Sequence, residues 1–212
     1  GIDPIKDIQV LTPVRKGTLG TASLNAQLQK MLNPPDSLKT EKKIGDRLFR
    51  EGDKVMQTRN NYRIGWKKRC DFSEGQGVFN GDIGYIHNID NDAGQMTVIF
   101  DEDRFVNYEF GQLDEVELAY AMTVHKSQGS EFPIVVMPVS WFPPMLATRN
   151  LLYTAVTRGK KVVILCGMQR RMEAMVDNNR IKLRFSGLKY RLRALIGRSI
   201  IGSNTEALGN EI

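Results

Sequence analysis

The chain has 212 residues, of which 41% are hydrophobic and 25% charged, and a formal net charge of +6. This composition is typical of a soluble globular protein, and the length allows one full core and a second small domain. No apolar run reaches the roughly 18 residues of a membrane span, and the N-terminus does not resemble a signal peptide, so we expect no membrane association. Because Cys70 and Cys166 lie in unlike contexts, we expect no disulfide framework and a cytoplasmic location. The first residue is not Met, which suggests a fragment.

The charges are unevenly distributed along the chain. Acidic residues concentrate between Asp71 and Glu117, whereas Lys and Arg concentrate between Arg158 and Arg198. The basic part suggests a polyanionic partner such as nucleic acid. A solvated basic helix face is the alternative.

The first 45 residues predict a strand, a helix and a linker. A buried strand is expected at residues 8–11, followed by a polar, Gly-containing turn. Leucine and methionine then recur at helical spacing from Leu24 to Leu32, and Pro34 ends this helix. Residues 36–45 are polar and are expected to form a linker.

The pattern changes between residues 46 and 111. Short strand-like runs such as "GVFNGDIGYIHNID" and "GQMTVIFDED" are bounded by Gly, Asn or Asp, which is typical of an antiparallel meander or small barrel. Residues 60–76 show no clear periodicity, so we expect an exposed loop there.

Residues 116–167 again read as α/β. We expect strands at 116–124, 134–140 and 161–167, with a helix at 145–159. The last two strands are continuous apolar runs, which indicates a parallel sheet buried on both faces. Residues 1–44 and 112–198 are therefore expected to form one α/β domain, with a small β domain inserted at 46–111 and a flexible tail at 199–212.

Several common catalytic motifs are absent from the sequence. The P-loop pattern G-x-x-x-x-G-K-[ST] does not occur, so this chain cannot build a standard nucleotide cradle by itself. The run "VIFDED" (98–103) imitates a magnesium-binding strand, but without a P-loop we interpret it as a solvated hairpin edge. No Cys/His spacing suits zinc, and we expect no metal site in the chain.

The segment "AYAMTVHKSQGSEF" (119–132) is unusually rich in polar groups after an apolar start. Ligands of open α/β sheets bind outside the carboxyl ends of the strands, so residues 123–131 lie where a site is expected. Ser127 and Gly129 would allow backbone N–H groups to approach a phosphate.

Arg158 follows the predicted apolar helix face and directly precedes Gly159. It could stabilise the C-terminus of its helix, which is worth about 0.3–1 kcal/mol. It could equally be an arginine finger that stabilises charge on a transferring phosphoryl group.

Four segments together resemble a known family. "AYAMTVHKSQGSEF" resembles motif V of superfamily 1 helicases, and "LLYTAVTRGK" resembles motif VI. "GDKVMQTRNN" with "FNGDIGYI" resembles the segment that precedes motif V in RecD-like helicases, and "IQVLTPVRKGTLGTASLNAQLQ" resembles their motif IV. The late segment "NNRIKLRFSGLKYRL" also resembles the end of this family.

The resemblance implies an architecture. In this family two RecA-like domains clamp ATP between them, and single-stranded DNA crosses both. The P-loop and the Mg²⁺-binding carboxylate belong to the first, N-terminal domain. This chain would be the second RecA-like domain, a parallel sheet with helices on both faces, with an inserted Src-homology-3-like β-barrel. It would be the C-terminal motor half of a DNA helicase that translocates 5′ to 3′.

The resemblance also implies residue roles. The expected arginine finger is Arg158, and the expected contacts of the ATP site are Arg15, Gln128, Gly129 and Glu131. The expected DNA contacts are Thr123, His125, Lys126, Asn60 and Asn61. Asn60 and Asn61 could instead be an ordinary turn pair. In the basic stretch 63–69, Trp66 could stack on a base or pack against its own barrel.

Two other functions remain open from the sequence alone. The barrel and the basic tail could form a non-enzymatic single-strand-binding module, although such a module has no need of motifs V and VI. A degenerate NTPase acting as a scaffold is the third reading.

Overall fold

The structure is a computed structural model that describes residues 1–101, 103–180, 187–188 and 190–196. The chain divides into two units, residues 1–179 and residues 180–212. Residues 190–196 of the second unit are helical. The α/β domain was expected to continue to residue 198, whereas the chain divides after Asn179. The expected tail at 199–212 lies outside the described residues.

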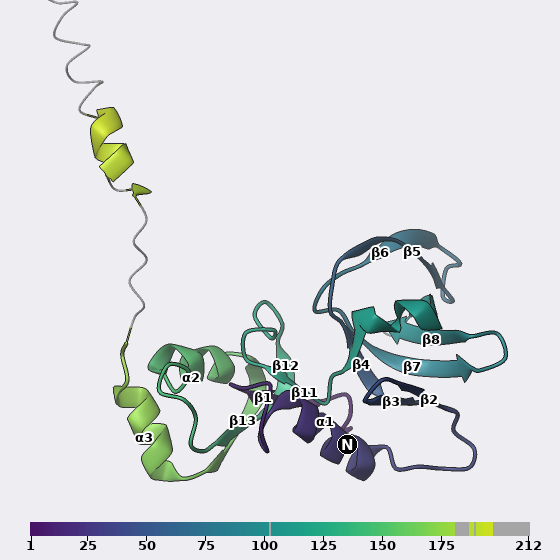
Figure 1. Cartoon of the computed structure of the whole chain (residues 1–212), viewed down its shortest axis with the longest axis horizontal. Coiled ribbons are helices and arrows are strands. Elements are labelled where there is room, and N and C mark those ends of the chain that lie inside the picture. Colours follow the sequence, from purple (N-terminus) through teal and green to yellow (C-terminus); the bar gives the residue numbers. More distant parts are fainter. Residues whose placement is uncertain (102, 181–186, 189, 197–212) are drawn as a thin grey trace, which may run out of the picture. The chain divides into compact units, whose positions relative to one another are not determined.

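The first unit contains a four-stranded parallel sheet (Figure 1). Its strand order is β11-β1-β12-β13, formed by Ala121–Thr123, Ile8–Thr12, Phe132–Val139 and Gly159–Gly167. All three strand pairs are parallel. The expected α/β sheet is therefore confirmed.

Three helices pack against this sheet. Helix α1 (Thr21–Leu32) contacts β11, whereas α2 (Arg149–Val156) and α3 (Gln169–Asp177) contact β12. From β1 and α1 the chain reaches β11 at one side of the sheet, and from β12 and α2 it reaches β13 at the other side. Because such connections between parallel strands are right-handed, α1 and α2 lie on opposite faces of the sheet. The core between the sheet and α2 and α3 includes Leu11, Val135, Met137, Leu151, Leu152, Ala155 and Met175.

Helix α2 is shorter than the predicted helix at 145–159. It begins after Thr148, whose hydroxyl accepts a hydrogen bond from the N–H of Leu151 at 3.3 Å. Such a cap satisfies one of the free N–H groups at a helix start. Pro143 and Pro144 precede the cap, and proline lacks the N–H that a helix interior requires.

Seven further strands form the barrel, an antiparallel sheet that curls around its own core (Figure 1). Its order is β10-β4-β7-β8-β9-β5-β6. In chain order these strands are Lys54–Gln57, Asn61–Lys68, Glu74–Val78, Ile83–Asp90, Gln95–Phe100, Arg104–Glu109 and Val116–Leu118. A short 3₁₀ helix, η1 (Phe110–Glu115), precedes β10. The barrel core includes Val55, Ile86, Met96, Val98, Phe100, Val106 and Tyr108.

Two segments that were expected to be irregular contain strands. Residues 36–45 include β2 (Glu41–Ile44), which pairs with β3 (Arg47–Arg50) as a hairpin. Residues 60–76 form most of the β5–β6 hairpin rather than a loop. In β2 and β5 only Ile64 is buried, so the two sequences lack the apolar alternation that marks a half-buried strand.

The predicted strand at 116–124 is two strands in two different sheets. Val116–Leu118 pairs with β4 in the barrel, and Ala121–Thr123 pairs with β1 in the parallel sheet. Both halves are apolar because each enters a hydrophobic core, so hydropathy does not mark the break.

Strand β13 was expected to be buried on both faces, and this prediction is wrong. It is an edge strand, and Val162 and Ile164 are 46% and 45% exposed, whereas Val163 and Leu165 pack toward the core. The run "VIFDED" lies in β8 and the turn to β9, as expected for a hairpin edge. Within the described residues, no helix is long and apolar enough to cross a membrane.

A lysine is buried where the barrel meets the parallel sheet. Lys54, the first residue of β4, is 1% exposed, and its Nζ donates a hydrogen bond to the carbonyl oxygen of Ile8 at 3.2 Å. Burial lowers the pKa of Lys54 to about 8, although the carboxylates of Asp3 and Asp7 act in the opposite direction. Removal from water thus outweighs the nearby negative charge.

Lys54→Met should change how the stability of the chain depends on pH. Between about pH 8 and pH 10.5 the unfolded chain binds more protons at this lysine than the folded chain does. This difference should make the wild type more stable as pH rises through that window, by on the order of 1–3 kcal/mol. The variant should lack this component. Urea unfolding of both proteins near pH 7.5 and pH 10 measures it, and an identical pH dependence would contradict the assignment.

Candidate functional site

The polar segment 119–132 runs from the carboxyl ends of the parallel strands, at Thr123, back to their amino ends, at Phe132. Thr123 ends β11 and pairs in register with Thr12, whereas β12 begins at Phe132 and pairs Ile134 with Ile8. The two ends of the connecting loop are therefore about six residues apart along the strands, or about 20 Å. The strand pattern had placed residues 123–131 at the carboxyl ends of the strands, and the family resemblance had assigned Thr123, His125 and Lys126 to DNA and Gln128, Gly129 and Glu131 to the ATP site. Because β11 and β12 are parallel, the chain must return from the carboxyl end of one strand to the amino end of the next, so Thr123 and Phe132 lie at opposite ends of the sheet.

The loop between these ends is held by its own hydrogen bonds. The N–H groups of Lys126 and Ser127 both donate to the carbonyl oxygen of Thr123, at 2.9 and 3.2 Å. The hydroxyl of Ser127 is buried and donates to the carbonyl oxygen of Val124 at 2.8 Å. Ser127 therefore shapes the loop, and its N–H already has an acceptor. Gly129 has a φ of 90°, which a residue with a side chain adopts only with strain.

A cavity of about 520 Å³ opens beside Thr123 and Lys126, in the N-terminal part of the segment and at the carboxyl end of β11. It lies between α1, β11 and the barrel, and its polar residues include Arg15, Thr123 and Lys126. The apolar wall is formed by Ala22, Ala26, Leu48, Met56, Leu118 and Met122. The Nζ of Lys126 lies 3.2 Å from a carboxylate oxygen of Glu117. The structure thus groups Arg15 with two of the predicted DNA contacts.

Arg158 lies at the other end of the segment, beside Ser130 and Phe132. Its guanidinium donates to the carbonyl oxygens of Ser130 and Thr154, at 3.1 and 3.2 Å, and to the hydroxyl of Thr157 at 3.2 Å. The carbonyl oxygen of Arg158 accepts from the N–H of Phe132 at 2.8 Å. Motif VI is therefore fastened to the end of motif V. The contact with the carbonyl oxygen of Thr154 also stabilises the C-terminus of α2, which is the first of the two roles that the sequence suggested for Arg158.

Glu131 and Gln128 lie nearer to Arg158 along the loop than to Thr123. A carboxylate oxygen of Glu131 is 3.5 Å from the Nζ of Lys160, and both side chains are 57% exposed. Gln128 and His125 line a small depression of about 190 Å³ against α2, together with Thr148, Asn150 and Thr154. His125 thus shares a hollow with Gln128 and does not line the cavity of Thr123.

Asn60 and Asn61 lie in the barrel, and their side chains form hydrogen bonds. The side-chain oxygen of Asn60 accepts from the N–H of Asn80 at 2.9 Å. The side-chain oxygen of Asn61 accepts from the N–H of Ile64 at 3.1 Å, and its amide donates to Glu115 at 3.0 Å. Only the bond with Ile64 is local, as in a turn, whereas the other two tie Asn60 and Asn61 to distant parts of the chain.

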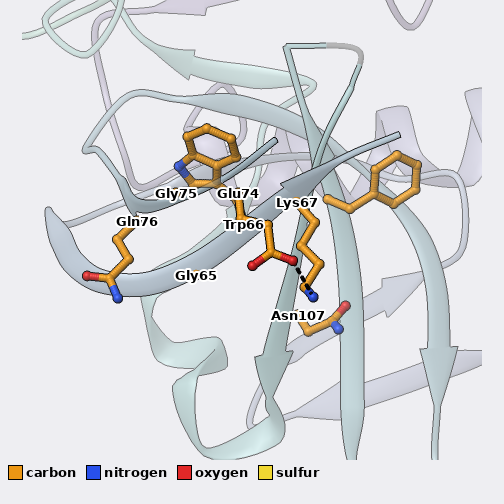
Figure 2. A pocket seen from close by; sticks show the side chains of 8 residues that line it. Gly65, Trp66, Lys67, Glu74, Gly75, Gln76 and Asn107 are labelled. Atoms are coloured by element: carbon orange, nitrogen blue, oxygen red, sulfur yellow. Dashed lines mark ion pairs between the residues drawn. The ribbon is translucent and has the colours of Figure 1, made fainter. Parts of the chain in front are cut away.

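A second cavity, of about 330 Å³, lies on the β5–β6 hairpin and β9 (Figure 2). Trp66 lines it and packs on Gly75, since a Cβ on this glycine would lie 2.3 Å from the Cζ2 of the indole. Lys67 and Glu74 form an ion pair of 2.6 Å beside it. Trp66 thus packs on its own barrel, the second of the two arrangements considered from the sequence.

Sequence reasoning missed Asn25, which fixes the strand that carries Thr123. Its amide nitrogen donates to the carbonyl oxygens of Leu118 and Ala121, at 2.9 and 3.0 Å, and its oxygen accepts from the N–H of Ala121 at 2.7 Å. Asn25 is 8% exposed. A polar residue on the buried face of α1 was the available signal, because such a group needs partners.

Comparisons with known proteins agree with the architecture. The family profile described as the SH3 domain of ATP-dependent RecD-like DNA helicases matches residues 24–100. The profile of the UvrD-like helicase C-terminal domain matches residues 118–166. The first match contains most of the barrel, and the second contains motifs V and VI.

Individual relatives are longer than this chain. The ATP-dependent RecD2 DNA helicase of Deinococcus radiodurans is 33% identical over 187 residues, which are 88% of this chain and 24% of the relative. The RecBCD enzyme subunit RecD of Mycolicibacterium smegmatis is 31% identical over 188 residues, or 87% of this chain and 29% of the relative. The chain thus spans about a quarter of the length of these relatives.

Solved structures show the same fold at lower identity. A Bacteroides Pif1 described as bound to ssDNA gives a TM-score of 0.51 at 16% identity, covering 92% of this chain and 46% of that one. Pif1 helicase from Bacteroides in complex with ADP-AlF3 and ssDNA also gives 0.51, at 18% identity, covering 89% and 45%.

Proposed function

This chain belongs to the RecD-like helicases of superfamily 1 and corresponds to their C-terminal part, and from this premise we propose that it is the C-terminal motor half of an ATP-dependent DNA helicase. It would act in DNA unwinding and repair, and by resemblance it would move 5′ to 3′. Its partners would be single-stranded DNA and the N-terminal RecA-like domain of the same protein. Cys70 and Cys166 are free, which suits a reducing cytoplasm.

One observation carries this proposal: the segment 119–132 connects two distinct places on the domain. Its N-terminal part, with Thr123 and Lys126, lines a cavity together with Arg15, and its C-terminal end is hydrogen-bonded to Arg158. A pure DNA-binding module would need the first place and would have no use for the second. A motor needs both, because hydrolysis at one site must be linked to movement at the other.

At the C-terminal end of the segment, Arg158 would act as the arginine finger toward ATP held by the N-terminal domain, with Gln128, Gly129 and Glu131 beside the nucleotide. The guanidinium has five N–H donors, which suits a phosphoryl group. Bound ATP would supply the phosphoryl group and Mg²⁺ the charge that balances it. We assign Mg²⁺ to the N-terminal domain, and we expect the isolated chain to hydrolyse no ATP because it has no P-loop.

In the N-terminal part of the segment, Thr123 and Lys126 would contact DNA phosphates, and the cavity supports adding Arg15 to this group. His125 would contact the strand from the neighbouring hollow. Asn60 and Asn61 remain proposed DNA contacts, through the second N–H of each side-chain amide.

Lys126→Ala in the full-length protein should weaken binding to single-stranded DNA. Loss of one phosphate contact should reduce the slope of log affinity against log salt by about 0.7. The matched control is Lys30→Ala, an exposed lysine of α1 that does not line the cavity. Salt-titrated binding to an oligonucleotide measures both. An unchanged slope in Lys126→Ala would contradict the DNA assignment.

A further inference from the structure

Two strands carry the chain into and out of the barrel. Strand β4 enters and β10 leaves, and they pair with each other from Val116 opposite Gln57 to Leu118 opposite Val55. The N–H of Ala119 then donates to the carbonyl oxygen of Lys54 at 2.8 Å. Only Ala119 and Tyr120 separate β10 from β11, so the barrel is connected directly to the strand that ends at Thr123.

The buried carboxylate of Asp53 accepts hydrogen bonds from the segments that meet at this junction. The side chain of Asp53 is 0% exposed. One oxygen accepts from the amide of Asn33 at 2.8 Å and from the hydroxyl of Tyr120 at 2.9 Å. The other accepts from the amide of Gln29 at 2.6 Å and from the N–H of Arg50 at 2.7 Å. These donors come from α1 or its cap, from the β2–β3 hairpin and from the connection to β11, and Asp53 itself directly precedes the barrel strand β4.

None of the four donors is charged. Burial raises the pKa of Asp53, although the four hydrogen bonds act in the opposite direction. Among the described residues, no Lys or Arg side chain forms an ion pair with Asp53, so the carboxylate depends on having all four donors in place. Any shift of the barrel relative to α1 or Tyr120 would break one or more of these bonds. A fully satisfied buried network therefore favours a single arrangement of its parts.

The network continues into the parallel sheet. The carbonyl oxygen of Tyr120 accepts from the side-chain amide of Gln9 at 3.1 Å and from the N–H of Val10 at 3.2 Å. Both residues belong to β1. Tyr120 is thus held by the barrel through its hydroxyl and by the sheet through its backbone, three residues before Thr123.

We propose that the Asp53 network locks the barrel and the parallel sheet into one rigid body, and that Asp53 is a positioning residue for the segment 119–132. The barrel then moves together with the DNA end of that segment. The role of this rigid body in translocation rests on the proposed helicase function, whereas its rigidity does not depend on that function.

The native cysteines allow the rigidity to be measured in this chain. Cys70 lies in the barrel, between β5 and β6, and Cys166 lies in β13 of the parallel sheet, and both are free and exposed. Spin labels on these two thiols report the distribution of distances between the two bodies. We expect a narrow distribution in the wild type, and one at least two-fold broader in Asp53→Asn, whose new N–H₂ would face donors.

Tyr120→Phe is a milder second variant that removes one donor and should also broaden the distribution. The matched control is Val98→Ala, which weakens the barrel core without touching the junction and should keep the wild-type width. Wild-type widths in both Asp53→Asn and Tyr120→Phe would overturn the proposal, as would equal broadening in Val98→Ala.

A second measurement tests the functional part in the full-length protein. The number of base pairs unwound per ATP hydrolysed does not depend on the fraction of folded enzyme, so simple destabilisation leaves it unchanged. We expect Asp53→Asn to lower this ratio at least three-fold and Val98→Ala to preserve it. An unchanged ratio in Asp53→Asn would refute the positioning role. A wild type without DNA-dependent ATPase would instead refute the proposed function and leave the distance measurement valid.

Discussion

Arg158→Ala in the full-length protein should lower ATP turnover by about 10³-fold or more, while binding to single-stranded DNA stays within about two-fold. An arginine finger contributes on the order of 10³–10⁵ in rate in other phosphoryl-transfer enzymes. In the structure the guanidinium contacts Ser130, Thr154 and Thr157, all of this chain. It must turn away from some of these groups to reach a nucleotide held by another domain.

Two further variants make this prediction specific. Arg158→Lys keeps the positive charge and loses the planar fork, so its turnover should stay far below the wild type. Lys161→Ala removes a nearby exposed cation and should retain turnover within about two-fold. Steady-state ATP hydrolysis at saturating DNA measures all three. Turnover near the wild-type value in Arg158→Ala would show that this residue only caps its helix.

Asn25→Ala should lower the free energy of unfolding of this chain by about 3 kcal/mol. Its side chain makes three hydrogen bonds to the backbone of Leu118 and Ala121. Removing it leaves buried N–H and C=O groups without partners, each of which costs about 1–3 kcal/mol before relaxation. Asn25→Asp should fare no better, because a second carboxylate oxygen would face two carbonyl oxygens.

Gln27→Ala is the matched control on the exposed face of the same helix, and it should change stability by less than about 0.5 kcal/mol. Urea unfolding measures each variant. A loss below about 1 kcal/mol in Asn25→Ala would mean that the strand carrying Thr123 does not depend on this contact.

The main architecture could be predicted because it follows from continuous apolar runs. Strand β12 and helix α2 have clear patterns, and the turn residues of the barrel are frequent enough to show its short strands. Prediction failed where the hydropathy pattern of a strand does not match its burial in the structure. The apolar run from Val116 to Val124 enters two cores in succession, and β13 is apolar although half of its side chains face outward.

The sequence proposes candidate site residues, but it does not predict how the fold groups them. Motifs name residues in sequence order, whereas a tight turn sends neighbours to different surfaces. His125 and Lys126 are adjacent, yet one lines the hollow beside α2 and the other lines the cavity beside α1. Arg15 is distant in sequence from both and joins Lys126. Only the path of the chain across the sheet determines such groups.

The central claim is that the two ends of the segment 119–132 serve different ligands. ATP turnover of the full-length Lys126→Ala protein, measured against the concentration of single-stranded DNA, tests it most directly. We predict that the half-saturating DNA concentration rises several-fold while the plateau stays within about two-fold of the wild type. A collapsed plateau with an unchanged half-saturating concentration would contradict the separation of the two ends.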